Sequence, residues 1–111
     1  MYIGIDIAKL KFDAALLTQD GKYKHKSFKN AASGFSEFLL WCQSLHAQDA
    51  HFCMEATGIY YEALANFLVD EKCKVSVSNP AQISAFACSA LSRVKTDKAA
   101  ATLLARFCQA M

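Results

Sequence analysis

Three acidic residues occupy positions where a carboxylate is unusual, and together they could hold metal ions. Asp6 lies inside an alternating apolar run, Glu55 closes a short apolar run, and Asp97 begins the last helical pattern. Strands disfavour an acid, and an acid that closes an apolar strand is partly desolvated. Taken singly, Asp97 could complement a helix dipole and Glu55 could be a turn residue. As a set, they offer the oxygen ligands that suit Mg²⁺ or Mn²⁺, and two such ions can hold both reacting oxygens of a phosphodiester.

The elements that must position these acids begin with strands. Alternating or β-branched apolar runs predict strands over residues 2–7, 11–18, 22–28, 51–55 and 74–78. Asp20-Gly21 supplies a tight hairpin turn between the second and third strands, because both residues tolerate positive φ. The first three strands are therefore expected to be antiparallel.

Helical periodicity appears between and after the later strands. Ser33 is expected to cap a helix with apolar positions at Phe35, Phe38 and Cys42. A second helix is predicted over 59–70, and a third is expected to begin at Asn79-Pro80, since proline suits the first helical position. The last helix is expected to be capped by Thr96 and to carry an apolar stripe of Leu103, Leu104 and Phe107.

This order of elements predicts an α/β domain with a mixed five-stranded sheet and helices on both faces. In such sheets neighbouring strand ends converge on one crevice, which would bring Asp6 and Glu55 together. The 111 residues allow a single domain over 1–111. The last helix reaches Met111 without a glycine cap, so we expect a fragment of a longer protein.

Composition narrows the class of protein. Hydrophobic residues make up 54% and charged residues 20%, with a net charge of +2, which excludes a disordered or fibrous chain. No apolar run reaches the ~18 residues of a membrane span, and the early Asp6 does not fit a signal peptide. The five cysteines match no zinc-ligand spacing. We therefore expect reduced thiols and a cytoplasmic protein.

Several stretches together indicate a family. They are Gly4–Lys9, Glu55–Tyr60 and Lys95–Lys98, followed by Ala101 and 104–107, with Asn79-Pro80 between them. In these stretches the chain resembles the amino-terminal domain of the DEDD transposases of the insertion-sequence 110 family, which includes the Piv-type DNA invertases. The resemblance implies a RuvC-like, ribonuclease-H-like fold and a two-metal nuclease centre using Mg²⁺ or Mn²⁺. It also implies a longer parent protein whose carboxy-terminal domain carries a conserved serine.

The implied function is metal-dependent DNA strand cleavage and transfer in the transposition of an insertion sequence. The implied partners are the DNA of the element ends and the target, further copies of the full-length protein, and, for some relatives, a guide RNA from the element. The implied location is the bacterial or archaeal cytoplasm, at the nucleoid.

The family's set of four acids is incomplete here. Asp6, Glu55 and Asp97 match the first three, but the family's fourth aspartate, three residues after Asp97, is replaced by Ala100. A helix brings positions i and i+3 together, so the missing carboxylate would have stood beside Asp97. Either the sequence is inactivated, or three acids suffice with water at the fourth position. We favour impaired activity, because each carboxylate offsets repulsion between two cations.

Basic and aromatic residues supply candidates for nucleic-acid contact. Five lie close in sequence to the acids and are predicted to guide a DNA backbone: Lys9, Lys11, Arg93, Lys95 and Lys98. A second cluster, Lys22, Lys24, His25, Lys26 and Lys29, could grip phosphates or could protect an edge strand from unwanted pairing. Of Tyr60 and Tyr61, which could stack on a base, at least one is expected to pack in the core.

Two other classes of function remain open from the sequence. A phosphotransferase of the actin and sugar-kinase fold also begins with a strand that carries Gly-Ile-Asp, but it needs a glycine in the phosphate loop, and none follows Asp6 here. A non-catalytic DNA-binding or dimerising module of the same fold is favoured by Ala100. ATP binding would identify the first class, and absence of Mn²⁺ binding would favour the second.

Overall fold

The computed structural model describes residues 1–56, 58–79, 81 and 97–110, and for 97–100 it describes the backbone alone. The strands are β1 (Tyr2–Ile7), β2 (Lys11–Leu17), β3 (Tyr23–Lys29), β4 (His51–Glu55) and β5 (Lys74–Ser78). The helices within this part of the chain are α1 (Ala32–Ser44), α2 (Glu62–Asp70) and α4 (Asp97–Ala110).

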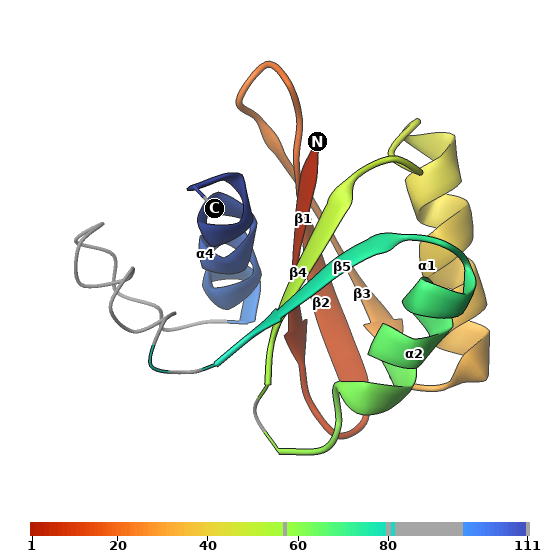
Figure 1. Cartoon of the computed structure of the whole chain (residues 1–111). Coiled ribbons are helices and arrows are strands. Elements are labelled where there is room, and N and C mark those ends of the chain that lie inside the picture. The colour runs from red at the N-terminus through yellow and green to blue at the C-terminus, as the bar shows by residue number, and fades with distance from the viewer. Residues whose placement is uncertain (57, 80, 82–96, 111) are drawn as a thin grey trace.

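The five strands form one sheet in the order β3-β2-β1-β4-β5. The pairs β1–β2 and β2–β3 are antiparallel, whereas β1–β4 and β4–β5 are parallel. Helices α1 and α2 cover one face, and α4 covers the other (Figure 1). The mixed sheet with helices on both faces, predicted from the sequence, is confirmed.

The hairpin between β2 and β3 turns where the sequence predicts. Gly21 has a φ of +84°, and its amide donates to the carbonyl oxygen of Thr18 at 3.1 Å. Glycine adopts this left-handed conformation without a steric penalty. The turn fixes the register that places Leu17 opposite Tyr23 and Asp13 opposite Ser27.

The main core lies between the sheet and the pair α1 and α2. Phe38 of α1 is fully buried, with its ring centroid 5.2 Å from that of Phe12 and 5.8 Å from that of Phe52. Ile3 and Ile5 of β1 belong to the same cluster. The isoleucines of β1 thus face α1 and α2, so the alternate residues Gly4 and Asp6 face α4.

Two helix boundaries differ from the sequence prediction. Helix α1 begins at Ala32, and no side chain caps it, so the cap expected at Ser33 is wrong. Its first turn lies close against the end of β3, because a Cβ on Gly34 would lie 1.8 Å from the carbonyl oxygen of Lys29.

Helix α2 begins at Glu62 rather than at residue 59. Gly58 has a φ of +66°, and the amide of Glu62 donates to the carbonyl oxygen of Ile59 at 3.2 Å, so residues 58–61 form a turn before the helix. The expected helix start at Pro80 and the expected cap at Thr96 lie outside the described residues.

The apolar stripe of the last helix is confirmed. Leu103, Leu104 and Phe107 form a second buried cluster with Cys53 and Cys108. Among the described residues, none of the helices has the length and apolar character that crossing a membrane requires.

Candidate metal centre

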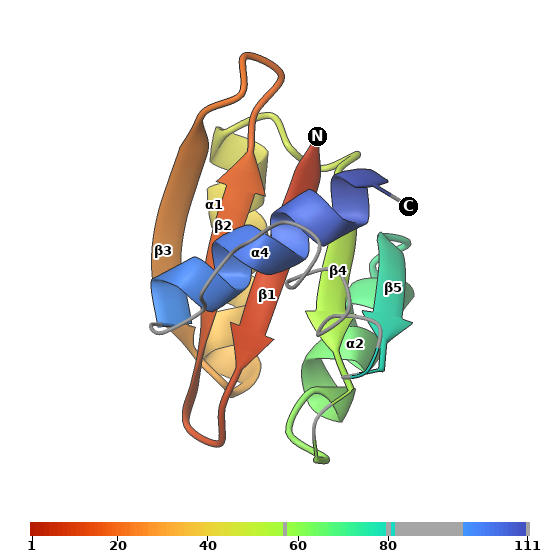
Figure 2. The same cartoon turned by 90° about the vertical axis from the view of Figure 1, so that its left-hand side faces the viewer.

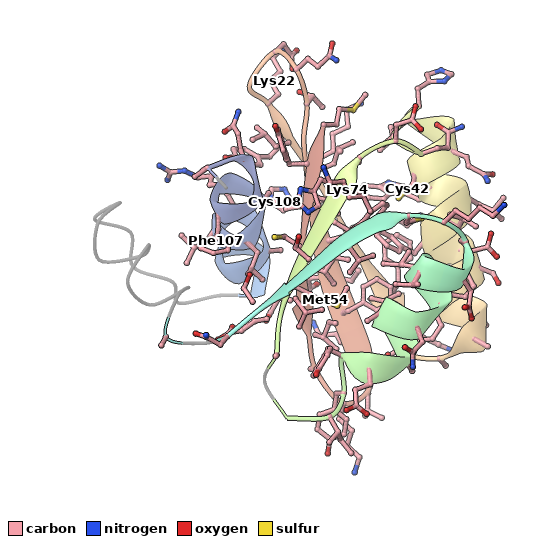
Figure 3. The ribbon with its side chains drawn as sticks, viewed as in Figure 1. Lys22, Cys42, Met54, Lys74, Phe107 and Cys108 are labelled. Carbon is pink, nitrogen blue, oxygen red and sulfur yellow. The ribbon has the colours of Figure 1, made fainter. Side chains whose placement is uncertain are left out.

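Asp6 and Glu55 lie near the carboxyl ends of two neighbouring parallel strands. The register of β1 and β4 pairs Ile5 with Met54, and Asp6 and Glu55 are the next residue on each strand. Both acids are partly exposed. Met54 (Figure 3), like Ile5, belongs to the core beneath α1 and α2. Because successive side chains of a strand alternate between faces, the two acids belong to the opposite face, which α4 covers (Figure 1).

Helix α4 approaches this face unusually closely because β1 carries a glycine there. A Cβ on Gly4 would lie 2.1 Å from the carbonyl oxygen of Ala101 and 2.2 Å from the amide nitrogen of Ala105. Only hydrogen fits at position 4, two residues before Asp6. The backbone of α4 therefore fills the space above Gly4 on this face.

The helix crosses the sheet diagonally, with its amino-terminal end over β2 and β3 and its carboxyl end over β4 (Figure 2). At one end, Nε2 of His25 lies 2.7 Å from Oγ1 of Thr102 in a hydrogen bond. At the other, the thiol of Cys108 donates to the carbonyl oxygen of His51 at 3.4 Å, and Cys108 lies between α4 and the strands (Figure 3). These contacts fix the helix whose first residue is Asp97.

The three predicted acids are placed to different degrees. Asp6 and Glu55 share one face and one end of the sheet, and Asp97 begins the helix on that face. Asp97 lies one helical turn before Ala101, the residue in contact with Gly4. For Asp97 and Ala100 the structure describes the backbone and not the side chain. Among the side chains that the structure does describe, no three His, Cys, Asp or Glu residues gather closely enough to bind a metal ion.

Sequence reasoning missed one acid in this region. Asp13 of β2 is paired directly with Asp6 of β1, so the two side chains share the face below α4. The side chain of Asp13 is 14% exposed, accepts a hydrogen bond from the hydroxyl of Ser27, and lies 3.7 Å from Nζ of Lys11. Like charges directly opposite one another destabilise a sheet, which makes this a position that favours a neighbouring cation. The alternation of residues 11–17 places Asp13 on the same face as Asp6 only once the register between β1 and β2 is known.

Of the five predicted DNA contacts, the structure describes two side chains. Lys9 and Lys11 are exposed and lie in or beside the β1–β2 loop, at the end of the sheet that carries Asp6. Lys11 also pairs with Asp13, as described above. Arg93 and Lys95 are outside the described residues, and so is the side chain of Lys98.

The second basic cluster belongs to an outer strand and the turn before it. Strand β3 is the edge of the sheet, and its lysines, Lys24, Lys26 and Lys29, are exposed, as is Lys22 in the turn. An edge strand is where lysines prevent unwanted pairing, so this interpretation fits the structure. Nζ of Lys26 lies 5.7 Å from the ring centroid of Phe28 on its own strand.

The two tyrosines after Glu55 have different environments. Tyr60 is 43% exposed, whereas Tyr61 packs against the main core, as expected for at least one of them.

The four described cysteines are free thiols. Burial raises the pKa of Cys42 to about 12, and a hydrogen bond with Cys108 lowers the pKa of Cys53 while the pKa of Cys108 is raised.

Comparisons with known proteins identify the family of this chain. A family model for transposases, of the DEDD type of insertion sequence 110, matches residues 3–111. The pilin gene-inverting protein of Moraxella lacunata is 45% identical over 108 residues, which cover 96% of this chain and 33% of that protein. The pilin gene-inverting protein of Moraxella bovis is 44% identical over 108 residues, with the same shares. The chain thus spans about a third of the length of these relatives.

Likeness to a solved structure establishes the fold. The RuvC structure of Thermus thermophilus superimposes with a TM-score of 0.59 at 12% identity, over 94% of this chain and 90% of that chain. The sheet is therefore of the RuvC-like, ribonuclease-H-like type. With the family model spanning nearly the whole sequence, the chain belongs to the DEDD transposases of the insertion-sequence 110 family.

Proposed function

We propose that this chain is a DNA recombinase domain in which Asp6, Glu55 and Asp97 hold Mg²⁺ or Mn²⁺ for the cleavage and transfer of DNA strands. The observation that carries the proposal is the register of β1: Asp6 is paired with Asp13 on one side, and on the other side it follows Ile5, whose partner Met54 directly precedes Glu55. This concentration of carboxylates at one partly exposed end of the sheet suits a divalent cation, because the carboxylates supply oxygen ligands and their negative charges repel one another. Membership of a transposase family supports DNA as the substrate.

The residues of the chain would divide the work between metal and substrate. Asp6 and Glu55 would hold cations from strand ends, and Asp97 from the start of α4. Ions held by these acids would supply Lewis-acid polarisation of a DNA phosphodiester. Lys9 and Lys11, exposed at the same end of the sheet, would bind backbone phosphates, which position DNA without reading its sequence.

Because Ala100 replaces the fourth acid, we propose that the activity of this chain is low. A cluster with three acids compensates the repulsion between two dications less well than one with four, so this chain would bind metal weakly and act slowly. The second candidate function, a non-catalytic DNA-binding or dimerising module, is favoured by the same residue. The phosphotransferase alternative gains no support, because Ile7-Ala8-Lys9 offers no glycine for a phosphate loop.

The wider setting of the proposed reaction follows from the family resemblance. We propose that the substrates are the ends of an insertion sequence and its target, in the cytoplasm of a bacterium or archaeon at the nucleoid. The further partners that we propose are other copies of the full-length protein and a guide RNA from the element.

Nicking of supercoiled plasmid DNA tests the proposed function. The assay compares the parent, Ala100→Asp, and the double variant Ala100→Asp with Asp6→Asn, each in millimolar Mn²⁺ and in chelator. We expect slow nicking by the parent, at least tenfold faster nicking by Ala100→Asp, and none by the double variant or in chelator. Equal nicking by Ala100→Asp and the double variant, or no nicking by Ala100→Asp, would contradict the proposal.

A further inference from the structure

Pairing between β1 and β4 stops immediately before the two proposed metal-binding residues. The register of the two strands runs from Tyr2 with His51 to Ile5 with Met54. Beyond that point β4 remains with β5, where the amide of Ala56 donates to the carbonyl oxygen of Ser78 at 2.8 Å. Strand β1 instead stays paired with β2 as far as Ile7 with Phe12. The chain segments that follow the two acids therefore part at the position where their separation matters.

A single side chain joins these segments again. Asn30 follows β3, and its Nδ2 donates to the carbonyl oxygen of Ala8 at 2.9 Å and to that of Tyr60 at 3.0 Å. Ala8 lies in the loop after Asp6, and Tyr60 lies in the loop after Glu55. The backbone amide of Asn30 also donates to the carbonyl oxygen of Leu10 at 3.0 Å. Asn30 thus holds three points on two loops.

The chemistry of the contacts requires an amide. Both partners of Nδ2 are carbonyl oxygens, so only the donor end of the side chain can face them. In the described part of the chain, the buried Oδ1 of Asn30 accepts no hydrogen bond. A buried acceptor without a donor costs free energy, and turning the amide around would cost more, because two carbonyl oxygens would then face a third oxygen. The two contacts therefore depend on the N–H groups of the Asn30 side chain.

We propose that Asn30 is a positioning residue that fixes the separation of Asp6 and Glu55 by bonding the loop that follows each. The inference rests on the proposed function, because a fixed separation matters for groups that share metal ions. A misplacement of a fraction of an ångström weakens such a site, and supporting hydrogen bonds prevent it. The strands alone do not provide this support, since their pairing ends at Ile5 and Met54.

The first test needs no substitution and no metal. In chelator, NMR measures hydrogen exchange of the two side-chain amide protons of Asn30, with the exposed Asn66 of α2 as the internal control. We expect the Asn30 protons to exchange at least tenfold more slowly than those of Asn66. Equal exchange would overturn the bridge, whatever the metal does.

The second test measures the consequence for the acids. Mn²⁺ binding is followed by electron paramagnetic resonance of the free ion, at a temperature where circular dichroism shows each variant folded. We expect Asn30→Ala to raise the Kd for Mn²⁺ at least tenfold and Asn66→Ala to leave it unchanged. A purely stabilising role would lower the melting temperature without changing the Kd of the folded protein. Equal Kd values for the parent and Asn30→Ala would therefore overturn the positioning role.

The two tests separate the bridge from the proposed function. A parent that binds no Mn²⁺ would refute the metal centre and with it the positioning role, whereas protected Asn30 protons would still establish the bridge. Should Asn30→Ala fail to fold, Asn30→Asp replaces it, because the carboxylate keeps the size of the side chain but removes both donors. Its expected result is the same rise in Kd, despite the added negative charge.

Discussion

The two faces of the sheet are built from the same strands but from different side chains. Toward α1 and α2 the strands present large groups such as Ile5, Phe12 and Phe52, which are fully buried. Toward α4 they present Gly4 and Cys53, and Ala101 of α4 contacts Gly4. One face is thus filled by rings and branched chains, and the other lets a helix backbone touch a strand.

This difference separates stability from placement. Burial of large apolar groups supplies most of the free energy of folding, so the face below α1 and α2 stabilises the domain. On the other face, backbone atoms of α4 and β1 meet at Gly4, so this contact fixes how closely α4 lies above β1, while Leu103, Leu104 and Phe107 are buried beside it. The acids belong to the α4 face. Substitutions on the two faces should therefore have different consequences for folding and for metal binding.

The largest loss of stability is expected on the aromatic face. Phe38→Ala removes a fully buried ring from between Phe12 and Phe52 and should lower the free energy of unfolding by about 3–5 kcal/mol. Urea denaturation measures this loss. Phe38→Leu, which leaves a smaller cavity, should lose less and keep the Mn²⁺ affinity of the parent. A changed affinity in folded Phe38→Leu would contradict the division between the faces.

A smaller loss of stability with a larger loss of metal binding is expected on the other face. Gly4→Ala forces α4 away from β1 and should lower the free energy of unfolding by about 1–3 kcal/mol. The Kd for Mn²⁺ should rise at least tenfold, because the start of α4 moves relative to Asp6. Gly21→Ala is the matched control: it has open space but a positive φ, so it should cost stability and leave the Kd unchanged.

Restoring the fourth acid should sharpen the same comparison with a modest effect. Ala100→Asp costs about 0.7 kcal/mol in helix propensity and adds repulsion from the other acids, so the melting temperature in chelator should fall. With Mn²⁺ the sign should reverse, and the metal-induced rise should exceed that of the parent. Thermal denaturation in both conditions measures the two changes. If neither changes, position 100 does not face Asp6 and Glu55.

The smallest effect concerns pH and lies at the far end of β4. Burial, and then the charge of Lys74, lowers the pKa of His51 below its ordinary value of 6.5. The unfolded chain therefore binds a proton more readily than the folded chain, and stability falls as pH decreases from about 7 through the folded pKa. His51→Gln should flatten this part of the curve of stability against pH. An unchanged slope would show that His51 does not titrate differently on folding.

Much of this architecture could be predicted from the sequence, because alternation and helical periodicity report burial directly. The strands, the turn at Gly21 and the stripe of Leu103, Leu104 and Phe107 are where the pattern places them. The start of α2 was not predictable in this way. The helical spacing of Tyr60, Leu64 and Phe67 extends the predicted helix back to residue 59, but the turn at Gly58 delays its start to Glu62.

The parts of the site that were missed depend on contacts between distant residues. Asp13 stands opposite Asp6 only because the β1–β2 connection sets their register. Residues 8–10 contain no turn motif from which this register could be predicted. Asn30 acts through partners 22 and 30 residues away. No local pattern carries such information, so Asp6 and Glu55 could be found from the sequence and their surroundings could not.

The most direct measurement is the Mn²⁺-induced shift in melting temperature of the parent compared with Asp6→Asn. A ligand that binds only the folded state adds RT ln(1 + [L]/Kd) to stability, about 2.7 kcal/mol at a hundredfold excess over Kd. A centre built on Asp6 predicts a rise for the parent at millimolar Mn²⁺ and none for Asp6→Asn. Equal rises in the two proteins, or no rise in the parent, would contradict the assignment of the metal centre to the α4 face.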